Sequence, residues 1–237
     1  MAKRIRPFLI SDQSIEDAII DGEIEKVKFL LGKGVNVESK FNDFTILIRA
    51  SFEGHFDTVE LLLNKGADIE AVDSEGYSSL LWAVEQSHKE IVKLLIDRGA
   101  DIDKADKEKY TPLMYAIMNN DFEIIKLLIE NGANIDAKNH EGKTALVSAV
   151  YENNPDIINY LIYKGSNLNT RSNDGWTPLM EAVDVGNPKI VELLLEMGAD
   201  IQAMNNRGET ALDYAIRTNQ SKIAKILNRN NSAECQL

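Results

Sequence analysis

The sequence predicts an all-α solenoid of helix-turn-helix repeats that are joined by β-turn or hairpin loops. The main evidence is a fixed period of 33 residues. Glycines mark this period at Gly66, Gly99, Gly132, Gly165 and Gly198. Alanines mark it at Ala50, Ala83, Ala116, Ala149, Ala182 and Ala215. Each period also holds two apolar runs with helical spacing, and a period of this length indicates stacked pairs of helices.

Seven repeats are expected, and the first and the last of them act as caps. Their expected bounds are 11–40, 41–72, 73–105, 106–138, 139–171, 172–204 and 205–229. Because a stack grows repeat by repeat, we expect one elongated domain over residues 11–229. Residues 1–10 are expected to form a flexible arm, and residues 230–237 a disordered tail.

The first repeat is expected to begin at Ser11, Asp12 or Ser14, because each of these residues can cap a helix. That helix should end at Gly22, and a second helix should follow over residues 23–32. The last repeat has the same pattern, but its outer helix becomes polar. A polar outer face stops a stack of repeats from polymerising.

Each of the five middle repeats has a turn signal followed by a threonine or serine. These residues are Thr45, Ser78, Thr111, Thr144 and Thr177. A hydroxyl in this position accepts hydrogen bonds from amides of the first helical turn. Pro112 and Pro178 follow two of them, at the helical position where a missing N–H costs least.

The first helix of each middle or last repeat should end at a residue with a left-handed backbone. These positions hold Gly54, Ser87, Asn120, Asn153, Gly186 and Asn219. Glycine and asparagine tolerate a positive φ, so Ser87 is the weakest member of the set. Lys109 stands where the turns of other repeats have glycine. We expect local strain or a different turn at that position.

The repeat over residues 172–204 carries the run Gly175-Trp176-Thr177-Pro178-Leu179, and Gly198-Ala199-Asp200 follows its second helix. This pattern resembles the ankyrin repeat, whose unit is a β-turn followed by two antiparallel helices. The resemblance covers about residues 12–229, and many spaced positions agree in register. It implies a binding groove made by the turn tips and the exposed face of the first helices.

Composition narrows the class of partner. The formal net charge of −12 argues against non-specific nucleic-acid binding, which needs lysine and arginine to displace counterions. The single cysteine, Cys235, cannot form an internal disulfide framework. The apolar run at residues 8–10 is too short for a signal peptide, and no run is long enough to cross a bilayer. We therefore expect a cytoplasmic protein without a membrane or nucleic-acid partner.

Candidate binding residues are those that the repeat pattern leaves free. The position before the capping residue is aromatic in four of six repeats, at Phe44, Tyr77, Tyr110 and Trp176. Together with nearby carboxylates, these rings predict a stripe that binds a protein or peptide carrying basic residues. The candidates are Phe44, Phe52, Tyr77, Trp82, Glu85, Tyr110, Tyr115, Met118, Tyr151, Asp174, Trp176, Glu181 and Asp184.

A structural interpretation of the same residues competes with the functional one. An aromatic ring before the cap can pack on the adjacent turn, and acidic residues often form a solvated face. Trp82 and Tyr115 are the better binding candidates, because a large ring on the groove side has no evident core role.

Catalysis finds little support in the sequence. His55 and His88 open second helices, where histidines usually make structural hydrogen bonds, and His140 stands alone at a turn tip. No pair of histidines has the spacing of metal ligands, and no glycine-rich loop could cradle a phosphate. An open groove also offers no closed pocket that would raise a carboxyl pKa. We expect no cofactor and no enzymatic activity.

The sequence thus predicts a monomeric, non-enzymatic module for protein–protein interaction, of the kind that serves as a scaffold. Three alternatives remain open. The chain could be an inhibitor that occludes a partner enzyme, or a pathogen-type effector delivered to another cell by a signal that is not visible here. It could also be a self-associating structural element.

Overall fold

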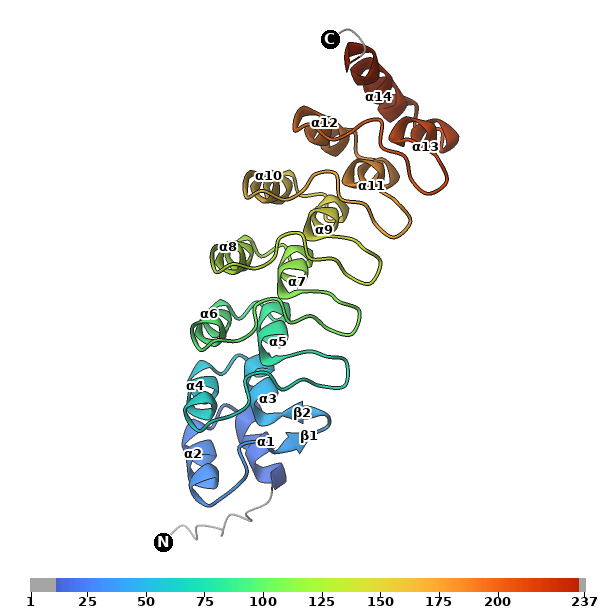
Figure 1. Ribbon diagram of the computed structural model, residues 1–237. Helices are drawn as coiled ribbons and strands as arrows, with labels where there is room; N and C mark the ends of the chain where they lie inside the picture. Colours follow the sequence, from blue (N-terminus) through green and yellow to red (C-terminus); the bar gives the residue numbers. More distant parts are fainter. Residues whose placement is uncertain (1–11, 235–237) are drawn as a thin grey trace. The chain divides into compact units, whose positions relative to one another are not determined.

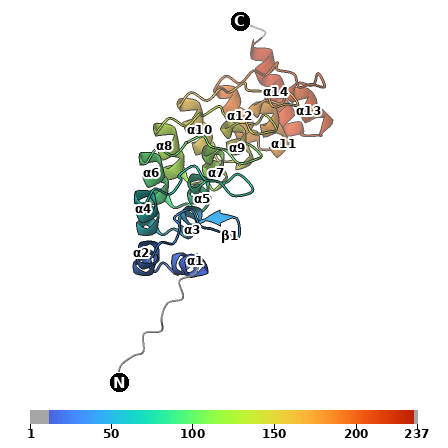
Figure 2. The ribbon, with the colours of Figure 1, turned by 60° about the horizontal axis from the view of Figure 1, so that its bottom comes forward.

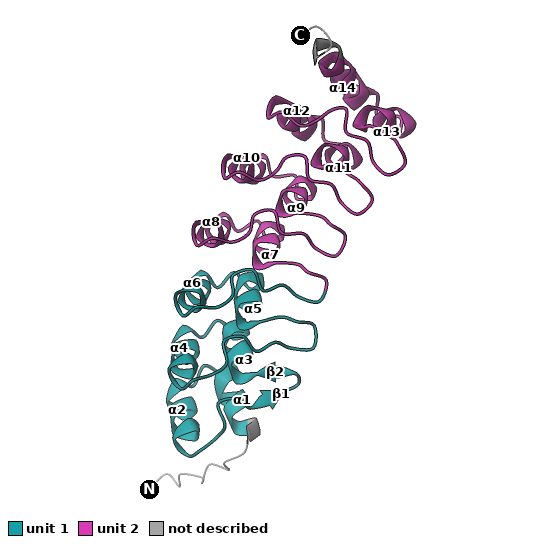
Figure 3. Cartoon of the chain, in the orientation of Figure 1, with its two compact units in different colours: residues 1–107 teal, residues 108–237 magenta. Residues whose placement is uncertain are grey.

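The computed structural model describes residues 12–234, which divide into two compact units (Figure 3). Unit 1 ends at Lys107, and unit 2 begins at Glu108. Within the described residues the chain forms 14 α-helices and one two-stranded sheet, and the helices follow one another as seven pairs. This arrangement confirms the predicted all-α repeat solenoid. The expected extent of one repeat domain over residues 11–229 stays a prediction, and the two units are described separately below.

Unit 1 contains three helix pairs and the sheet. Its elements are α1 (Asp12–Ile20), α2 (Ile24–Gly32), β1 (Lys40–Phe41), β2 (Phe44–Thr45), α3 (Ile46–Glu53), α4 (Phe56–Asn64), α5 (Ser79–Glu85) and α6 (Lys89–Asp97). The first helices α1, α3 and α5 pack on one another in that order, and the second helices α2, α4 and α6 form a parallel row beside them (Figures 1 and 2).

Unit 2 contains four helix pairs. They are α7 (Pro112–Met118), α8 (Phe122–Glu130), α9 (Ala145–Tyr151), α10 (Pro155–Tyr163), α11 (Pro178–Val185), α12 (Pro188–Glu196), α13 (Ala211–Arg217) and α14 (Ser221–Glu234). Helices α7, α9, α11 and α13 pack successively, so the first helices again make one layer. The turn tips project from the side of this layer that faces away from the second helices (Figure 1).

The core of each unit is built on the periodic alanines. All six alanines that mark the period are completely buried, at 0 % exposure. They lie in first helices that pack directly on their neighbours, where interior packing density leaves no space for a larger side chain. Branched apolar residues such as Leu80 and Ile158 are also buried.

Threonine and serine cap the first helices as predicted. The hydroxyl of Thr45 accepts from the amide of Ile48 at 3.2 Å, and Ser78, Thr111 and Thr177 make the equivalent bond. Thr144 also occupies the cap position, but its buried hydroxyl has no hydrogen-bond partner. The helix that follows Thr144, α9, therefore begins without the side-chain bond that anchors its neighbours.

Left-handed residues close the first helices at every predicted position. The φ angle is +57° at Ser87, +57° at Asn120 and Asn153, and +59° at Asn219, and Gly54 and Gly186 are also positive. Lys109 has φ of +62°. The turn at Lys109 is therefore the same left-handed turn that glycine forms in other repeats. Because lysine has a Cβ, this backbone is strained, so of the two expected alternatives the structure has local strain and not a different turn.

The histidines of unit 1 lock one repeat to the next. His88 Nε2 lies 3.0 Å from the carbonyl oxygen of Phe52, and His55 Nε2 lies 3.3 Å from that of Ile20. The backbone of Gly54 approaches the His88 ring so closely that a Cβ there would lie 2.5 Å from Cε1. Both histidines therefore have the structural role that was predicted for them.

The turn tips are tied together by a regular backbone ladder. In unit 2, the amide of His140 donates to the carbonyl of Glu108 at 2.9 Å, and Asn173 donates to Glu141 at 2.9 Å. The first turn is a hairpin, in which β1 pairs with β2 in antiparallel register around a two-residue loop with positive φ angles. This ladder holds the side chains of the tips at a fixed spacing.

The C-terminal end differs from the prediction. Residues 230–237 were expected to be disordered, but helix α14 continues to Glu234. In this part of the helix, the Asn230 side chain donates to the carbonyl of Ile226, and Asn230 is only partly exposed. The expected arm at residues 1–10 and residues 235–237 lie outside the described residues. No helix in the described part of the chain is long and apolar enough to cross a membrane.

Candidate functional site

Four of the predicted aromatic residues gather into one cluster in unit 1. The Trp82 ring centroid lies 5.3 Å from that of Phe44, 5.1 Å from Phe52 and 4.7 Å from Tyr77. Phe44 and Tyr77 come from turn tips, whereas Phe52 and Trp82 come from the first helices α3 and α5. All four side chains are partly buried, because each ring covers its neighbours.

Polar contacts hold this cluster in place. The Trp82 indole N–H donates to Asp73 Oδ2 at 2.9 Å, and Asp73 is itself buried. The Arg49 guanidinium lies 4.6 Å from the Phe44 ring centroid and 3.3 Å from a carboxylate oxygen of Glu16. Trp82, for which the sequence indicated no evident core role, therefore has a structural role, since its ring links two turns to two helices.

The middle candidates differ in their exposure. Tyr115 is buried at 9 % exposure and lies 5.9 Å from the ring of Tyr110, so its predicted lack of a core role is also wrong. Met118 is 44 % exposed. Glu85 is partly buried, and this burial raises the pKa of its carboxyl.

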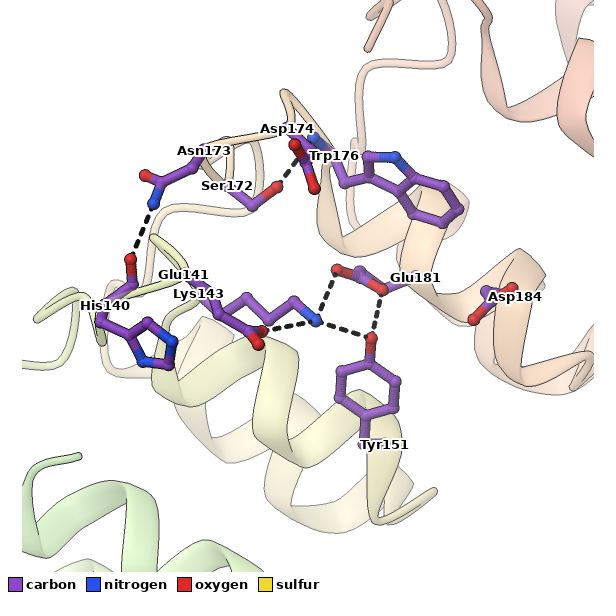
Figure 4. Close-up of a pocket in the computed structure, with 10 residues that line it drawn as sticks. All are labelled: His140, Glu141, Lys143, Tyr151, Ser172, Asn173, Asp174, Trp176, Glu181 and Asp184. Atoms are coloured by element: carbon purple, nitrogen blue, oxygen red, sulfur yellow. Dashed lines mark hydrogen bonds and ion pairs between the residues drawn. The ribbon is translucent and has the colours of Figure 1, made fainter. Parts of the chain in front are cut away.

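The remaining candidates meet around one hollow in unit 2 (Figure 4). Its volume is about 460 Å³, and its walls come from two successive turn tips and the first helices α9 and α11. The lining residues are His140, Glu141, Lys143, Tyr151, Ser172, Asn173, Asp174, Trp176, Glu181 and Asp184. Five of them, Tyr151, Asp174, Trp176, Glu181 and Asp184, were predicted from the sequence.

Glu181 forms the floor of this hollow. Its side chain is buried at 3 % exposure, although the sequence suggested a carboxylate on the free surface. The Tyr151 hydroxyl donates to Glu181 Oε2 at 2.5 Å, and Lys143 Nζ lies 3.6 Å from Glu181 Oε1. Glu181 is therefore held by the neighbouring repeat, and it belongs to the structure of the hollow as well as to its lining.

Lys143 is the central cation of the hollow. Its ammonium donates to the Tyr151 hydroxyl at 3.1 Å and pairs with Glu141 at 3.0 Å, and it lies 5.0 Å from the Tyr151 ring centroid. Figure 4 shows these contacts converging on its amine from three sides. One ammonium thus joins a turn tip, the end of helix α9 and the first turn of helix α11.

The groups in this cluster have shifted pKa values. Burial raises the pKa of Glu181, and burial with the hydrogen bond to Glu181 raises that of Tyr151 to about 12. Burial alone would lower the pKa of Lys143, but its bonds to Tyr151 and Glu141 and the charge of Glu181 raise it above the ordinary value. The sequence-based expectation that no carboxyl pKa would be raised here is wrong, because the two repeats enclose Glu181.

The opposite wall of the hollow is aromatic and acidic. The Trp176 ring packs edge-on against Tyr214, with 4.8 Å between the ring centroids. The Tyr214 hydroxyl donates to Asp184, and the carboxylates of Asp174 and Asp184 are exposed to solvent. An indole and two exposed carboxylates that line the same hollow can contact a cation through both π and charge interactions.

Five residues that line the hollow are not among the candidates: His140, Glu141, Lys143, Ser172 and Asn173. Lys143 was passed over because the repeat pattern treats it as an ordinary turn residue, whereas Glu141 was counted only among the carboxylates near the aromatic stripe. His140 was expected to stand alone, but its Nδ1 lies 2.9 Å from a carboxylate oxygen of Glu108. The one available signal was that Lys143 occupies a position that is aromatic in four other repeats. Among the described residues, no group of three histidines, cysteines or carboxylates could hold a metal ion.

The fold and the hollow together define a helical repeat protein whose distinctive side chains lie on turn tips and first helices. The sequence model described as "Ankyrin repeats (3 copies)" matches residues 15–106, 101–172 and 164–237. The chain therefore belongs to the ankyrin repeat family. Ankyrin repeats are generally modules for protein–protein interaction and are typically non-enzymatic.

Solved structures agree with this assignment. The chain is similar to the crystal structure of the human ASB11 ankyrin repeat domain, with a TM-score of 0.76 and 25 % sequence identity. The match covers 91 % of this chain and 96 % of that domain. No curated protein sequence matches the chain. The similarity thus concerns the fold.

Proposed function

We propose that the chain is a non-enzymatic binding module that takes a protein or peptide partner with basic residues on its turn tips and first helices. The observation that carries the proposal is the hollow of unit 2, where Trp176 stands beside the exposed carboxylates of Asp174 and Asp184. Four carboxylates and one lysine line this hollow, so its charge favours a cationic guest.

Unit 1 supports the proposal in a different way. Its aromatic cluster leaves Phe44, Phe52, Tyr77 and Trp82 partly exposed in one patch, and it is held rigid by Asp73 and Arg49. A preformed patch loses little conformational entropy when a partner binds. The internal contacts of these rings mean that alanine substitutions there would disturb the fold as well as binding. In unit 2, Trp176 has one aromatic neighbour among the described residues, Tyr214, so unit 2 is the better place for a test.

Affinity capture from an extract of the native cell tests the proposal. Wild-type chain should retain one or more proteins that a Trp176→Ala variant loses, and those proteins should elute at high salt because salt screens exposed charges. Tyr163→Ala is the matched control, since Tyr163 is 84 % exposed on helix α10 and lies outside the hollow. Capture of the same proteins by wild type and Trp176→Ala would contradict the proposal.

We further propose that the chain is monomeric, and that it is cytoplasmic, as ankyrin repeat proteins commonly are. Light scattering coupled to size-exclusion chromatography should give a mass near 26.5 kDa. A dimer mass would favour the self-associating alternative. Fractionation of the native cell with an antibody to the chain tests the compartment.

A further inference from the structure

We propose that the hollow of unit 2 receives an arginine side chain of the partner beside Trp176, and that the positive charge of Lys143 on the opposite wall weakens the binding of this guest. The inference rests on the proposed function and deepens it. It assigns the chemistry of the guest, and it assigns to Lys143 the role of setting the affinity. The partner is an extended segment or loop that projects one guanidinium between Trp176 and the neighbouring carboxylates.

The contacts of Lys143 show which chemistry the hollow accepts. Its ammonium lies 3.0 Å from Glu141 and 3.6 Å from Glu181, and it lies 5.0 Å from the centroid of the Tyr151 ring. Carboxylates on two sides and an aromatic ring on a third are the surroundings that a buried cation requires. The hollow already holds one cation from its own chain, so a cation from a partner meets complementary groups there.

Lys143 does not satisfy the whole site. The exposed carboxylates of Asp174 and Asp184 lie on the far wall with Trp176 (Figure 4). Figure 4 shows the Lys143 amine directed toward Tyr151 and Glu181, with the Trp176 ring on the other side of Glu181. The lining carries four carboxylates, at Glu141, Asp174, Glu181 and Asp184, against the single ammonium of Lys143. Negative charge therefore remains for a second cation beside the indole.

Geometry favours a guanidinium over a second ammonium. A guanidinium is planar, so it can stack on the indole of Trp176 while its edge donates two parallel hydrogen bonds to a carboxylate. An ammonium is compact and strongly hydrated, and it forms no such fork. The positive charge of Lys143 repels either guest. Removing this charge should therefore strengthen binding, even though the contacts of Lys143 with Glu141 and Glu181 are lost.

The two tryptophans make a direct test possible, because Trp82 lies in unit 1 and Trp176 lies in unit 2. Nitrogen-15-labelled full chain would be titrated with N-acetyl-arginine methylamide while both indole N–H signals are followed by NMR. The Trp176 signal should shift in a saturable way and the Trp82 signal should not. N-acetyl-citrulline methylamide has nearly the same shape without the charge, and it should leave both signals in place. The lysine analogue should bind more weakly than the arginine probe.

Three variants separate recognition from structure. Lys143→Met keeps the length of the side chain and removes its charge, and it should lower the midpoint of the arginine titration by about fivefold, the size of one exposed charge interaction. Lys189→Met, on an exposed residue of helix α12, should leave the midpoint unchanged. Asp174→Asn removes an exposed carboxylate of the hollow and should raise the midpoint at least twofold. Well-dispersed amide spectra confirm that each variant is folded.

Several outcomes would overturn the inference. Equal shifts of the Trp176 signal with the arginine and citrulline probes, or a shift of the Trp82 signal alone, would show that the hollow does not bind a guanidinium. An unchanged or raised midpoint of the arginine titration in folded Lys143→Met would show that Lys143 does not weaken guanidinium binding. If that variant does not fold, an unchanged midpoint in Asp174→Asn would show that the hollow does not bind a guanidinium. Protein capture that still depends on Trp176 would then leave the broader proposed function standing.

Discussion

At the scale of single residues, Glu181 shows how a repeat position acquires special chemistry. Its side chain would be an ordinary surface carboxylate on an isolated helix α11. In the stack it is 3 % exposed, and it accepts a hydrogen bond from Tyr151 and lies near Lys143. A buried charge must be paired or hydrogen-bonded. Glu181, Tyr151 and Lys143 therefore behave as one unit, and a change to one alters the other two.

The phenol of Tyr151 should ionise at unusually high pH. Its folded-state pKa of about 12 lies above the ordinary value of 10.0, because the hydroxyl is buried and donates to Glu181. The folded state holds this proton more tightly than the unfolded chain does. Its contribution to stability is thus complete below about pH 10 and is lost as the pH rises toward about 12.

The difference in tyrosinate absorbance between wild type and Tyr151→Phe measures this ionisation. The Tyr151 component should be absent at the ordinary tyrosine pKa and should appear near pH 12. A Tyr151 component with its midpoint at the ordinary value would show that the phenol does not donate to Glu181 in solution.

Lys109 carries backbone strain that glycine would relieve. Its φ of +62° costs a residue with a Cβ about 1–2 kcal/mol, whereas glycine adopts it freely and loses about 0.5–1 kcal/mol in chain entropy. Lys109→Gly should therefore stabilise the protein by about 0.5 kcal/mol, measured as a higher urea midpoint. Lys107→Gly, at a residue without positive φ, should destabilise it instead. A lower midpoint for Lys109→Gly would contradict the strain.

At the scale of helices and turns, the contact between Gly54 and His88 couples neighbouring repeats. Gly54 ends helix α3 with φ of +82°, and the His88 ring at the start of helix α6 lies against its backbone. The ring nitrogen reaches the carbonyl of Phe52 at 3.0 Å. One glycine thus meets two demands, a left-handed backbone and the absence of a Cβ.

Alanine at Gly54 should be far more harmful than alanine at Gly66. Both residues have positive φ, at +82° and +84°, but a Cβ at Gly66 would meet nothing within 4 Å. Gly66→Ala should cost only the backbone term of about 1–2 kcal/mol. Gly54→Ala should cost about 2–4 kcal/mol, because the methyl group would also collide with His88.

A double-mutant cycle in urea isolates the steric part. In a His88→Ala background, Gly54→Ala should cost about as much as Gly66→Ala does in the wild type. Equal costs in the presence and absence of the His88 ring would rule out the coupling.

At the scale of the whole molecule, stability should be distributed over the repeats and not concentrated in one core. Each first helix packs mainly on its immediate neighbours, as α3 does on α1 and α5 in unit 1. The described residues divide into two compact units for the same reason. In such an array, the effect of a substitution is felt most strongly in its own and adjacent repeats.

The two tryptophans can report this distribution, one in each unit. Trp176→Phe leaves the emission of Trp82, and Trp82→Phe leaves that of Trp176. When Gly54→Ala is added, the unfolding midpoint seen by Trp82 should fall by more than the midpoint seen by Trp176. An equal fall in both would show that the two units unfold as one cooperative block.

The local features of the fold were predictable from the sequence. The capping residues, the left-handed positions and the helix pairs each depend on a few consecutive side chains and on backbone sterics. Such features repeat whenever the residue pattern repeats. Ser87 shows the strength of this signal, because it adopts the predicted left-handed backbone without being glycine or asparagine. Trp176 and Asp184, two residues that the repeat pattern does not use, were among the candidates from the sequence, and both line the hollow.

The environment of each candidate could be decided only by the tertiary structure. Tyr151 and Glu181 are 30 residues apart, and their contact depends on how far the side chains of one repeat reach toward the next. The same packing buried Tyr115, joined Trp82 to Asp73 and placed Lys143 in the hollow. The 33-residue period shows which residues occupy equivalent positions in successive repeats. Burial and partners depend on distances between repeats, which the residue pattern along the chain does not contain.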